Sequence, residues 1–248
     1  MISAGCSSAA SIMGQLISLL WPPSEEPAED HPFIHAIRNP EVLDWKRGLS
    51  SEEIAETLSR QTPLPVEVAP WLLLGNQACA CDLERLTELG VTHVLNLCGR
   101  TVEGVNYADC GITAQVVEAE DEEGYQMVRC HFENAREFVN AARRENPAAR
   151  VLVHCVAGIN RSGLIVAALY MVEQRVTVLD VVAHVRMRRG NIALCNESFQ
   201  AQLVALARRE NLLGVEPGAK GSALPAAPAG SARANRNKAP SKSIRTLF

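Results

Sequence analysis

The residues best suited to chemistry lie in one nine-residue segment, HCVAGINRS, which spans residues 154–162. A short, fully apolar run at residues 151–153 precedes it, and a largely apolar run at residues 163–174 follows it. This pattern predicts a buried strand, a loop and a buried helix. A loop between a strand and a helix gathers backbone N–H groups at one point, and the helix dipole adds positive potential there. The segment is therefore expected to bind an anion.

The loop carries side chains that suit a phosphate group. Arg161 can hold two phosphate oxygens at once, which a lysine cannot do. Gly158 lets the loop bend tightly. The residues expected to surround the phosphate are Val156, Ala157, Gly158, Ile159, Asn160 and Arg161.

Cys155 is expected at the base of this anion site. The loop amides, the helix N-terminus and Arg161 all stabilise a thiolate over a thiol, so Cys155 should act as a nucleophile. Ser162 can donate a hydrogen bond to the sulfur when it leaves, and His154 is expected to fix the loop through hydrogen bonds without touching the substrate.

The other cysteines have simpler interpretations. A lone cysteine is usually a small core residue, and this is the expectation for Cys110, Cys130 and Cys195. Cys79 and Cys81 are only one residue apart, which is too close for an ordinary zinc pair, so no metal site is expected.

Strands and helices alternate along the part of the chain that must position these residues. The expected fold is a single α/β domain with a central, mostly parallel sheet of about five strands, flanked by helices. Asn196 is expected to cap the last helix and to lie behind the loop. The expected strands are residues 66–68, 71–74, 91–97, 113–118 and 151–153, and the expected helices are residues 82–89, 131–144, 163–174, 178–189 and 197–210.

The ends of the chain differ from this core, which is expected over residues 66–213. Residues 1–65 read as an N-terminal extension with an acidic, proline-rich stretch at 22–32 and one short helix at 50–60. Residues 214–248 read as a disordered basic tail with a net charge of +5, so the rest of the chain carries −9. An acidic body disfavours a nucleic-acid surface, which needs a basic footprint.

The chain shows no sign of insertion into a membrane. No stretch approaches the roughly 18 to 20 apolar residues that a spanning helix requires. A secretory signal has basic residues before its apolar stretch, and the weakly apolar stretch at the N-terminus has none before it. The eight cysteines lie unevenly, unlike those of a small secreted scaffold. A cytoplasmic location, with the nucleus as the alternative, is therefore expected.

Three stretches of the chain carry a resemblance to a known family. HCVAGINRS fits the HCxxGxxRS signature of cysteine-dependent protein phosphatases. Residues 72–97 resemble the opening pattern of the dual-specificity subfamily, and NESFQAQL, residues 196–203, resembles its closing pattern. The resemblance covers about residues 66–213 and implies a dual-specificity phosphatase catalytic domain there.

The resemblance implies that phosphotyrosine and phosphoserine/threonine monoesters of phosphoproteins are hydrolysed through a phosphocysteine, with no metal or cofactor. It also implies a general acid, an aspartate on a loop about thirty residues before the nucleophile. Asp121 lies 34 positions before Cys155. Its assignment needs a one-residue insertion in the loop, so Glu122 and Glu120 remain rivals.

Other functions stay open at this level. The loop contains no lysine, which disfavours inositol lipids with their additional phosphates, and the acidic body disfavours RNA 5′-phosphates. A pseudophosphatase that binds phosphoproteins without turnover would keep the anion site, although such relatives commonly lose the cysteine or the arginine. The sequence leaves the oligomeric state undetermined.

Cys98 is a candidate for redox protection of Cys155. It follows the expected strand at 91–97, which should run beside the strand at 151–153, and neighbouring parallel strands end at the same edge of a sheet. A disulfide needs α-carbons within about 7 Å, which this placement allows. Alternatively, Cys98 merely ends a core strand, and Cys110 would be the next candidate.

Overall fold

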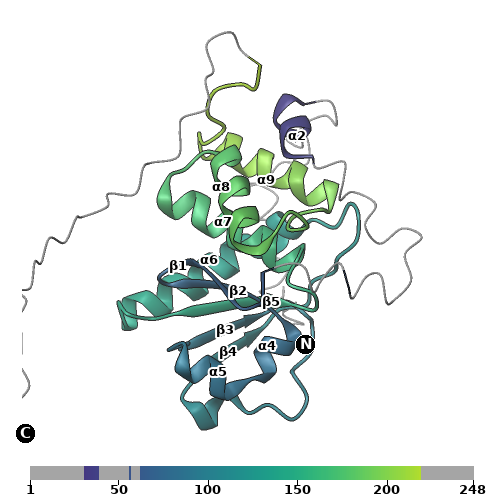
Figure 1. Cartoon of the computed structure of the whole chain (residues 1–248). Coiled ribbons are helices and arrows are strands. Elements are labelled where there is room, and N and C mark those ends of the chain that lie inside the picture. The colour runs from purple at the N-terminus through teal and green to yellow at the C-terminus, as the bar shows by residue number, and fades with distance from the viewer. Residues whose placement is uncertain (1–30, 39–55, 57–61, 219–248) are drawn as a thin grey trace, which may run out of the picture.

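The computed structural model describes residues 31–38, 56 and 62–218. These residues include a five-stranded sheet (Figure 1). β1 pairs antiparallel with β2, and the other pairings are parallel. The expected α/β fold with a mostly parallel sheet of about five strands is therefore confirmed. In spatial order the strands are β1 (Val66–Ala69), β2 (Leu72–Asn76), β5 (Val151–Cys155), β3 (His93–Asn96) and β4 (Thr113–Val116).

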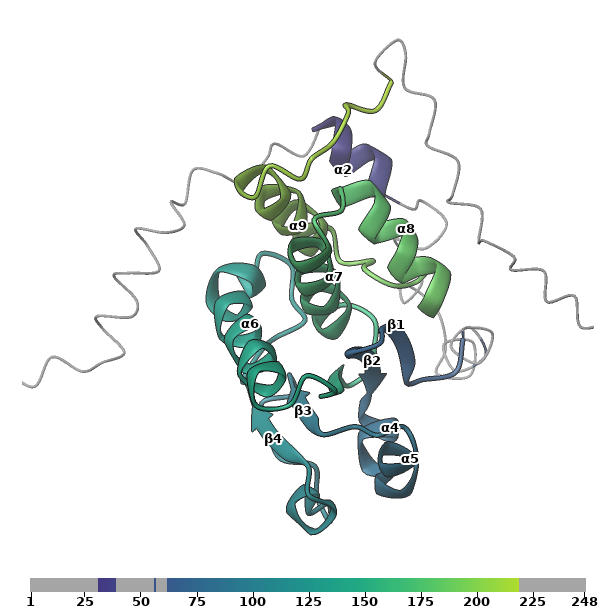
Figure 2. The ribbon, with the colours of Figure 1, turned by 90° about the vertical axis from the view of Figure 1, so that its left-hand side faces the viewer.

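Helices cover both faces of the sheet, with α4 and α5 on one side and α6, α7, α8 and α9 on the other (Figures 1 and 2). Their bounds are α4 Gln77–Cys81, α5 Leu83–Glu88, α6 Met127–Glu145, α7 Arg161–Gln174, α8 Val178–Arg189 and α9 Glu197–Arg209, and a short 3-10 helix, η2, spans Tyr107–Cys110.

Two of these helices differ from the expectation. The sequence predicted no helix at residues 77–81, because the five residues of α4 are too few to show a helical period. The Asn76 side chain caps α4 by accepting a hydrogen bond from Cys79 N–H (2.9 Å). α6 begins at Met127 rather than at residue 131. No side chain caps its start at Gln126, so the sequence carries no signal for that boundary.

β5 lies at the centre of the sheet, between β2 and β3, and all five of its residues are buried. Its side chains alternate between two cores. Val151 and Val153 pack with the layer of α6 to α9, whereas Leu152 packs with α4 and α5. This alternation explains why the strand reads as a continuous apolar run.

α7 follows β5 directly, and most of its side chains are buried because other helices and the sheet surround it. Despite this apolar character, no helix in the described ranges is both long enough and apolar enough to cross a bilayer.

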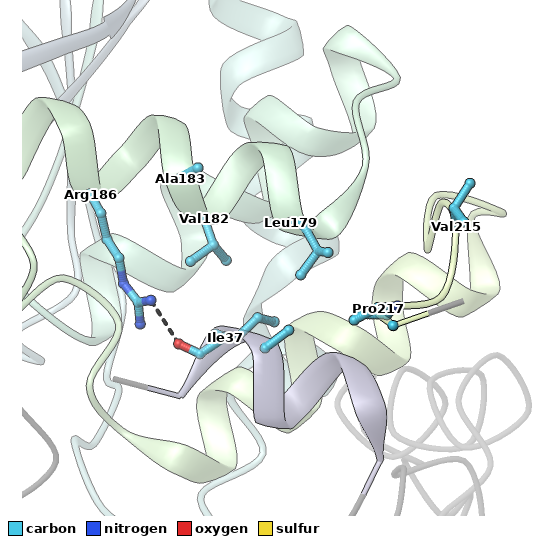
Figure 3. A pocket seen from close by; sticks show the side chains of 9 residues that line it. Ile37, Leu179, Val182, Ala183, Arg186, Val215 and Pro217 are labelled. Carbon is cyan, nitrogen blue, oxygen red and sulfur yellow. Dashed lines mark hydrogen bonds between the residues drawn. The ribbon is translucent and has the colours of Figure 1, made fainter. Parts of the chain in front are cut away.

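A helix from the N-terminal extension, α2 (Pro32–Ile37), also belongs to the core. Its three buried side chains, Phe33, Ile34 and Ile37, pack in the same cluster as α8 and α9. The Arg186 guanidinium donates a hydrogen bond to Ile37 O (2.7 Å; Figure 3), and Arg38 forms a 2.6 Å ion pair with Glu197. The sequence predicted a core that begins at Val66, but the core of the structure also includes α2.

The remaining expectations for the ends lie largely outside the described residues. The expected helix at 50–60 is described only at Glu56, and most of the acidic stretch at 22–32 and of the tail at 214–248 is not described. The first tail residues are an exception, because Val215 and Pro217 line a pocket with α2 and α8 (Figure 3).

Because α2 is part of the core, Ile37→Ala should lower the free energy of unfolding by about 3 kcal/mol, as expected for a buried isoleucine. Val215→Ala is the matched control: this side chain lines the same pocket but is 67% exposed. The control should stay within about 0.5 kcal/mol of wild type in urea denaturation. If Ile37→Ala also stayed within about 0.5 kcal/mol of wild type, α2 would not contribute to the stability of the fold.

Candidate active site

The segment HCVAGINRS forms the expected strand, loop and helix start. β5 ends at Cys155, α7 begins at Arg161, and residues 156–160 connect them. Gly158 adopts a φ of +67°, and a Cβ atom there would lie 2.5 Å from Leu64 Cδ1 and 2.8 Å from Gly75 O. Both the backbone conformation and the close packing therefore require glycine at this position.

The carbonyl groups of residues 156–159 accept hydrogen bonds on the side of the loop that faces away from the anion site. Each of the four accepts a hydrogen bond from a neighbouring segment, which keeps the negative ends of these peptide dipoles turned away from the anion site. Gln77 N donates to Val156 O (3.2 Å), the Arg189 guanidinium to Ala157 O (3.5 Å) and Gly158 O (3.1 Å), and Leu194 N to Ile159 O (3.1 Å).

The sequence did not reveal the role of Arg189. Arg189 is only 3% exposed, and its guanidinium also donates a hydrogen bond to Thr62 O (3.2 Å). Burial lowers its pKa, and nearby Cys155 opposes that shift. The available signal was a group of three arginines in the last turn of α8, but helix periodicity alone does not show which of them points inward.

Cys155 and Ser162 meet as expected. The Cys155 side chain is buried, and its Sγ lies 3.2 Å from Ser162 Oγ. Ser162 Oγ also lies within 3.4 Å of Gly75 O. The hydroxyl is therefore in position to hydrogen-bond the sulfur.

Arg161 is anchored by one nitrogen. Nη1 donates to Leu97 O (3.1 Å) and to Ala119 O (3.0 Å). Nε is buried and has no hydrogen-bond partner in the described part of the chain. The guanidinium thus has a fixed orientation and retains a donor that a phosphate oxygen can satisfy.

Asp121 is the acidic residue that reaches the loop. Its Oδ2 accepts a hydrogen bond from Asn160 Nδ2 (3.4 Å), while its Oδ1 is buried without a partner among the described residues. The rivals Glu120 and Glu122 are both exposed. Of the three candidate carboxylates, the structure places Asp121 in contact with the loop.

Asn160 contributes its side chain, which the sequence did not predict. Its Oδ1 accepts hydrogen bonds from Cys195 N (3.0 Å) and Asn196 N (3.1 Å). Asn196 is the N-cap of α9, as expected, because its Oδ1 accepts from Phe199 N (3.0 Å). Asn160 therefore joins the loop at residues 156–160 to Asp121 on one side and to the start of α9 on the other.

His154 differs from the expectation. It is fully buried, and neither ring nitrogen has a hydrogen bond of good geometry within the described residues, so the imidazole does not fix the loop in the expected way. Burial outweighs a backbone contact at Cys155 and lowers the pKa of His154 to about 4, with Arg161 adding to the effect. The ring is therefore neutral at physiological pH.

A buried cysteine beneath an anion loop, with an arginine at the start of the following helix, defines a cysteine-dependent phosphatase. A family model described as the dual specificity phosphatase catalytic domain matches residues 72–209. The chain therefore belongs to the dual-specificity phosphatases, and it is a protein phosphatase that acts on phosphoproteins.

Individual relatives agree with this assignment. Dual specificity protein phosphatase 26 of Bos taurus is 35% identical over 187 residues, which cover 75% of this chain and 81% of that protein. The Homo sapiens protein of that name is 34% identical over the same shares. The crystal structure of human DUSP28 has a TM-score of 0.53 and 25% identity, covering 60% of this chain and 97% of the other. DUSP15 has a TM-score of 0.50 and 26% identity, covering 61% and 94%.

The buried His154 should make stability depend on pH. Its pKa is about 4 in the folded protein and 6.5 in the reference state, so the unfolded chain takes up a proton first as the pH falls. Protonation of His154 does not change the free energy of unfolding above about pH 6.5. Between pH 6.5 and pH 4 it lowers this free energy by about 3 kcal/mol. Urea denaturation of wild type and of His154→Gln should therefore show a steeper acid loss in wild type. Parallel curves would contradict the prediction.

The placement of Cys98 supports its proposed redox role. β3 and β5 are parallel neighbours, with Asn96 opposite His154, so Cys155 at the end of β5 and Cys98 two residues past β3 lie at the same edge of the sheet. Burial raises the pKa of the Cys98 thiol, and the nearby Cys155 raises it further. Cys110 and Cys130, which were expected in the core, are exposed.

Under brief peroxide treatment, Cys155 should form a sulfenic acid, and the Cys98 thiol should then condense with it to a disulfide, releasing water. Cys98→Ser should therefore turn reversible inactivation into irreversible over-oxidation. Activity after thiol reduction and mass spectrometry of the disulfide provide the measurements. Cys110→Ser is the control and should recover like wild type; equal recovery of Cys98→Ser would exclude the resolving role.

Proposed function

We propose that this phosphatase hydrolyses phosphotyrosine and phosphoserine/threonine monoesters through a phosphocysteine on Cys155. The observation that carries the proposal is the juxtaposition of Cys155 with the hydroxyl of Ser162, at 3.2 Å, at the start of the helix that supplies Arg161. Nucleophile, leaving-group donor and phosphate clamp thus come from one rigid strand and helix junction.

In the first step the Cys155 thiolate attacks phosphorus. The loop amides and Arg161 hold the equatorial oxygens, and this stabilisation grows as charge develops in the transition state. The protonated Asp121 carboxyl gives its proton to the departing oxygen as the bond between phosphorus and oxygen breaks. Asn160 supports this role because it hydrogen-bonds the Asp121 carboxyl at the edge of the loop.

In the second step water attacks the phosphocysteine. Asp121, now a carboxylate, accepts a proton from the water, and the bond between phosphorus and Cys155 sulfur breaks. Ser162 donates its hydrogen bond to the leaving thiolate. The loop dipoles and Arg161 supply the positive charge that this chemistry needs, so the proposed mechanism uses no divalent ion.

The loop composition supports protein substrates over inositol phosphates. Val156, Ile159 and Asn160 place no lysine beside the bound phosphate, and the half-exposed Val156 adds apolar surface. A cytoplasmic location, with the nucleus as the alternative, is proposed from cysteine usage in the sequence alone.

Cys155→Ser should abolish turnover while leaving vanadate or tungstate binding largely intact, because the anion loop remains. Arg161→Lys should lose at least about 100-fold in kcat/KM, since a point charge cannot replace the two-pronged contact. Aryl phosphate hydrolysis and oxyanion titration measure these effects. Wild type with no turnover but intact oxyanion binding would favour the pseudophosphatase alternative.

Asp121→Asn should lower kcat/KM for phenyl phosphate by about 100-fold but by less than about tenfold for para-nitrophenyl phosphate, whose leaving group hardly needs a proton. The basic limb of its pH profile should flatten. Glu122→Gln is the comparison variant. If Glu122→Gln shows the leaving-group pattern and Asp121→Asn does not, the acid is Glu122.

A further inference from the structure

The loop that carries Asp121 is bound to the start of α9 through the carboxylate of Glu123. Glu197 N donates to Glu123 Oε1 (3.2 Å), and Ser198 N donates to Oε2 (3.0 Å). Both donors belong to the first turn of α9. One carboxylate therefore binds two successive backbone amides of a helix that is part of the core.

This contact satisfies a general requirement of helices. The first N–H groups of a helix have no partner within it, and the helix dipole favours negative charge at that end. The Asn196 cap binds Phe199 N, which leaves the two preceding donors for Glu123. The interaction combines charge with defined geometry, although Glu123 itself is exposed to solvent.

The two ends of the acid loop are fixed separately. Ala119 O accepts a hydrogen bond from Arg161 (3.0 Å). At the other end, the buried Gln202 donates to Tyr125 O (2.8 Å) and accepts from Val128 N (3.0 Å). Asp121 lies between these anchors and two residues before Glu123, so Glu123 restrains the middle of the loop.

We propose that Glu123 is a positioning residue for the general acid. By binding the first turn of α9, it holds the loop so that the Asp121 carboxyl stays beside Asn160 at the edge of the anion site. Asn160 also binds the backbone at Asn196. The loop that carries Asp121 and the loop at residues 156–160 are therefore both attached to the start of α9. The proposal rests on the assignment of Asp121 as the acid under the proposed function.

A positioning role differs measurably from a purely structural one. In the transfer to Cys155, loss of positioning weakens only proton donation by Asp121, so its cost depends on the leaving group. It also disappears once Asp121 can no longer donate. A structural defect, in contrast, lowers the rate for every substrate and persists in an Asp121 variant.

The experiment measures kcat/KM for phenyl phosphate and for para-nitrophenyl phosphate, because this parameter reports the transfer to Cys155. Glu123→Ala should lose about tenfold with phenyl phosphate and less than about twofold with para-nitrophenyl phosphate. Glu123→Gln retains one acceptor oxygen and should lie between Glu123→Ala and wild type. Glu103→Ala, which removes an exposed glutamate from the loop between β3 and β4, is the control and should match wild type.

A double variant completes the test. Glu123→Ala in an Asp121→Asn background should cause no further loss with phenyl phosphate, since the two residues act on one proton transfer. A loss that is equal for both substrates, or that adds fully to Asp121→Asn, would overturn the positioning role alone. If Asp121→Asn itself shows no dependence on the leaving group, the acid assignment fails and the role of Glu123 fails with it.

Discussion

The site depends on how the carbonyl groups of residues 156–159 are satisfied. A tight loop can turn its N–H groups towards an anion only if its carbonyl groups find donors on the opposite side. Here α4, α8 and the segment before α9 supply those donors, and one of them, the side chain of Arg189, is a buried charged group that binds two of the carbonyls. The surrounding layers therefore do more than cover the sheet, because they fix the polarity of the loop that binds phosphate.

The net charge of the chain repels an anionic substrate, so donors within the site itself must bind it. The net charge of the whole sequence is −4, and the loop that carries Asp121 adds three exposed glutamates, Glu120, Glu122 and Glu123. Arg161 counters this field because two backbone carbonyls hold one of its nitrogens and leave its buried Nε without a partner. Oriented donors in direct contact with the anion outweigh these exposed surface charges, which solvent screens.

The start of α9 connects parts of the chain that are far apart in sequence. Asn160 binds the backbone there, Glu123 binds its first turn, and Arg38, just after α2, forms an ion pair with Glu197. The acid loop, the anion loop and the N-terminal helix thus share one attachment point. The geometry of residues 154–162 is therefore maintained by contacts that lie outside this segment.

The sequence alone determined the strand, the loop and the helix that carry Cys155 and Arg161, because apolar runs, Gly158 and an arginine at fixed spacing are local signals. It also determined the mostly parallel sheet, through the alternation of strands and helices. Only the tertiary structure decided that Asp121 rather than Glu120 or Glu122 reaches Asn160, that α2 joins the core, and that Arg189 points inward. These outcomes depend on contacts between residues distant in sequence, and no local pattern of charge or periodicity encodes which partner each side chain meets.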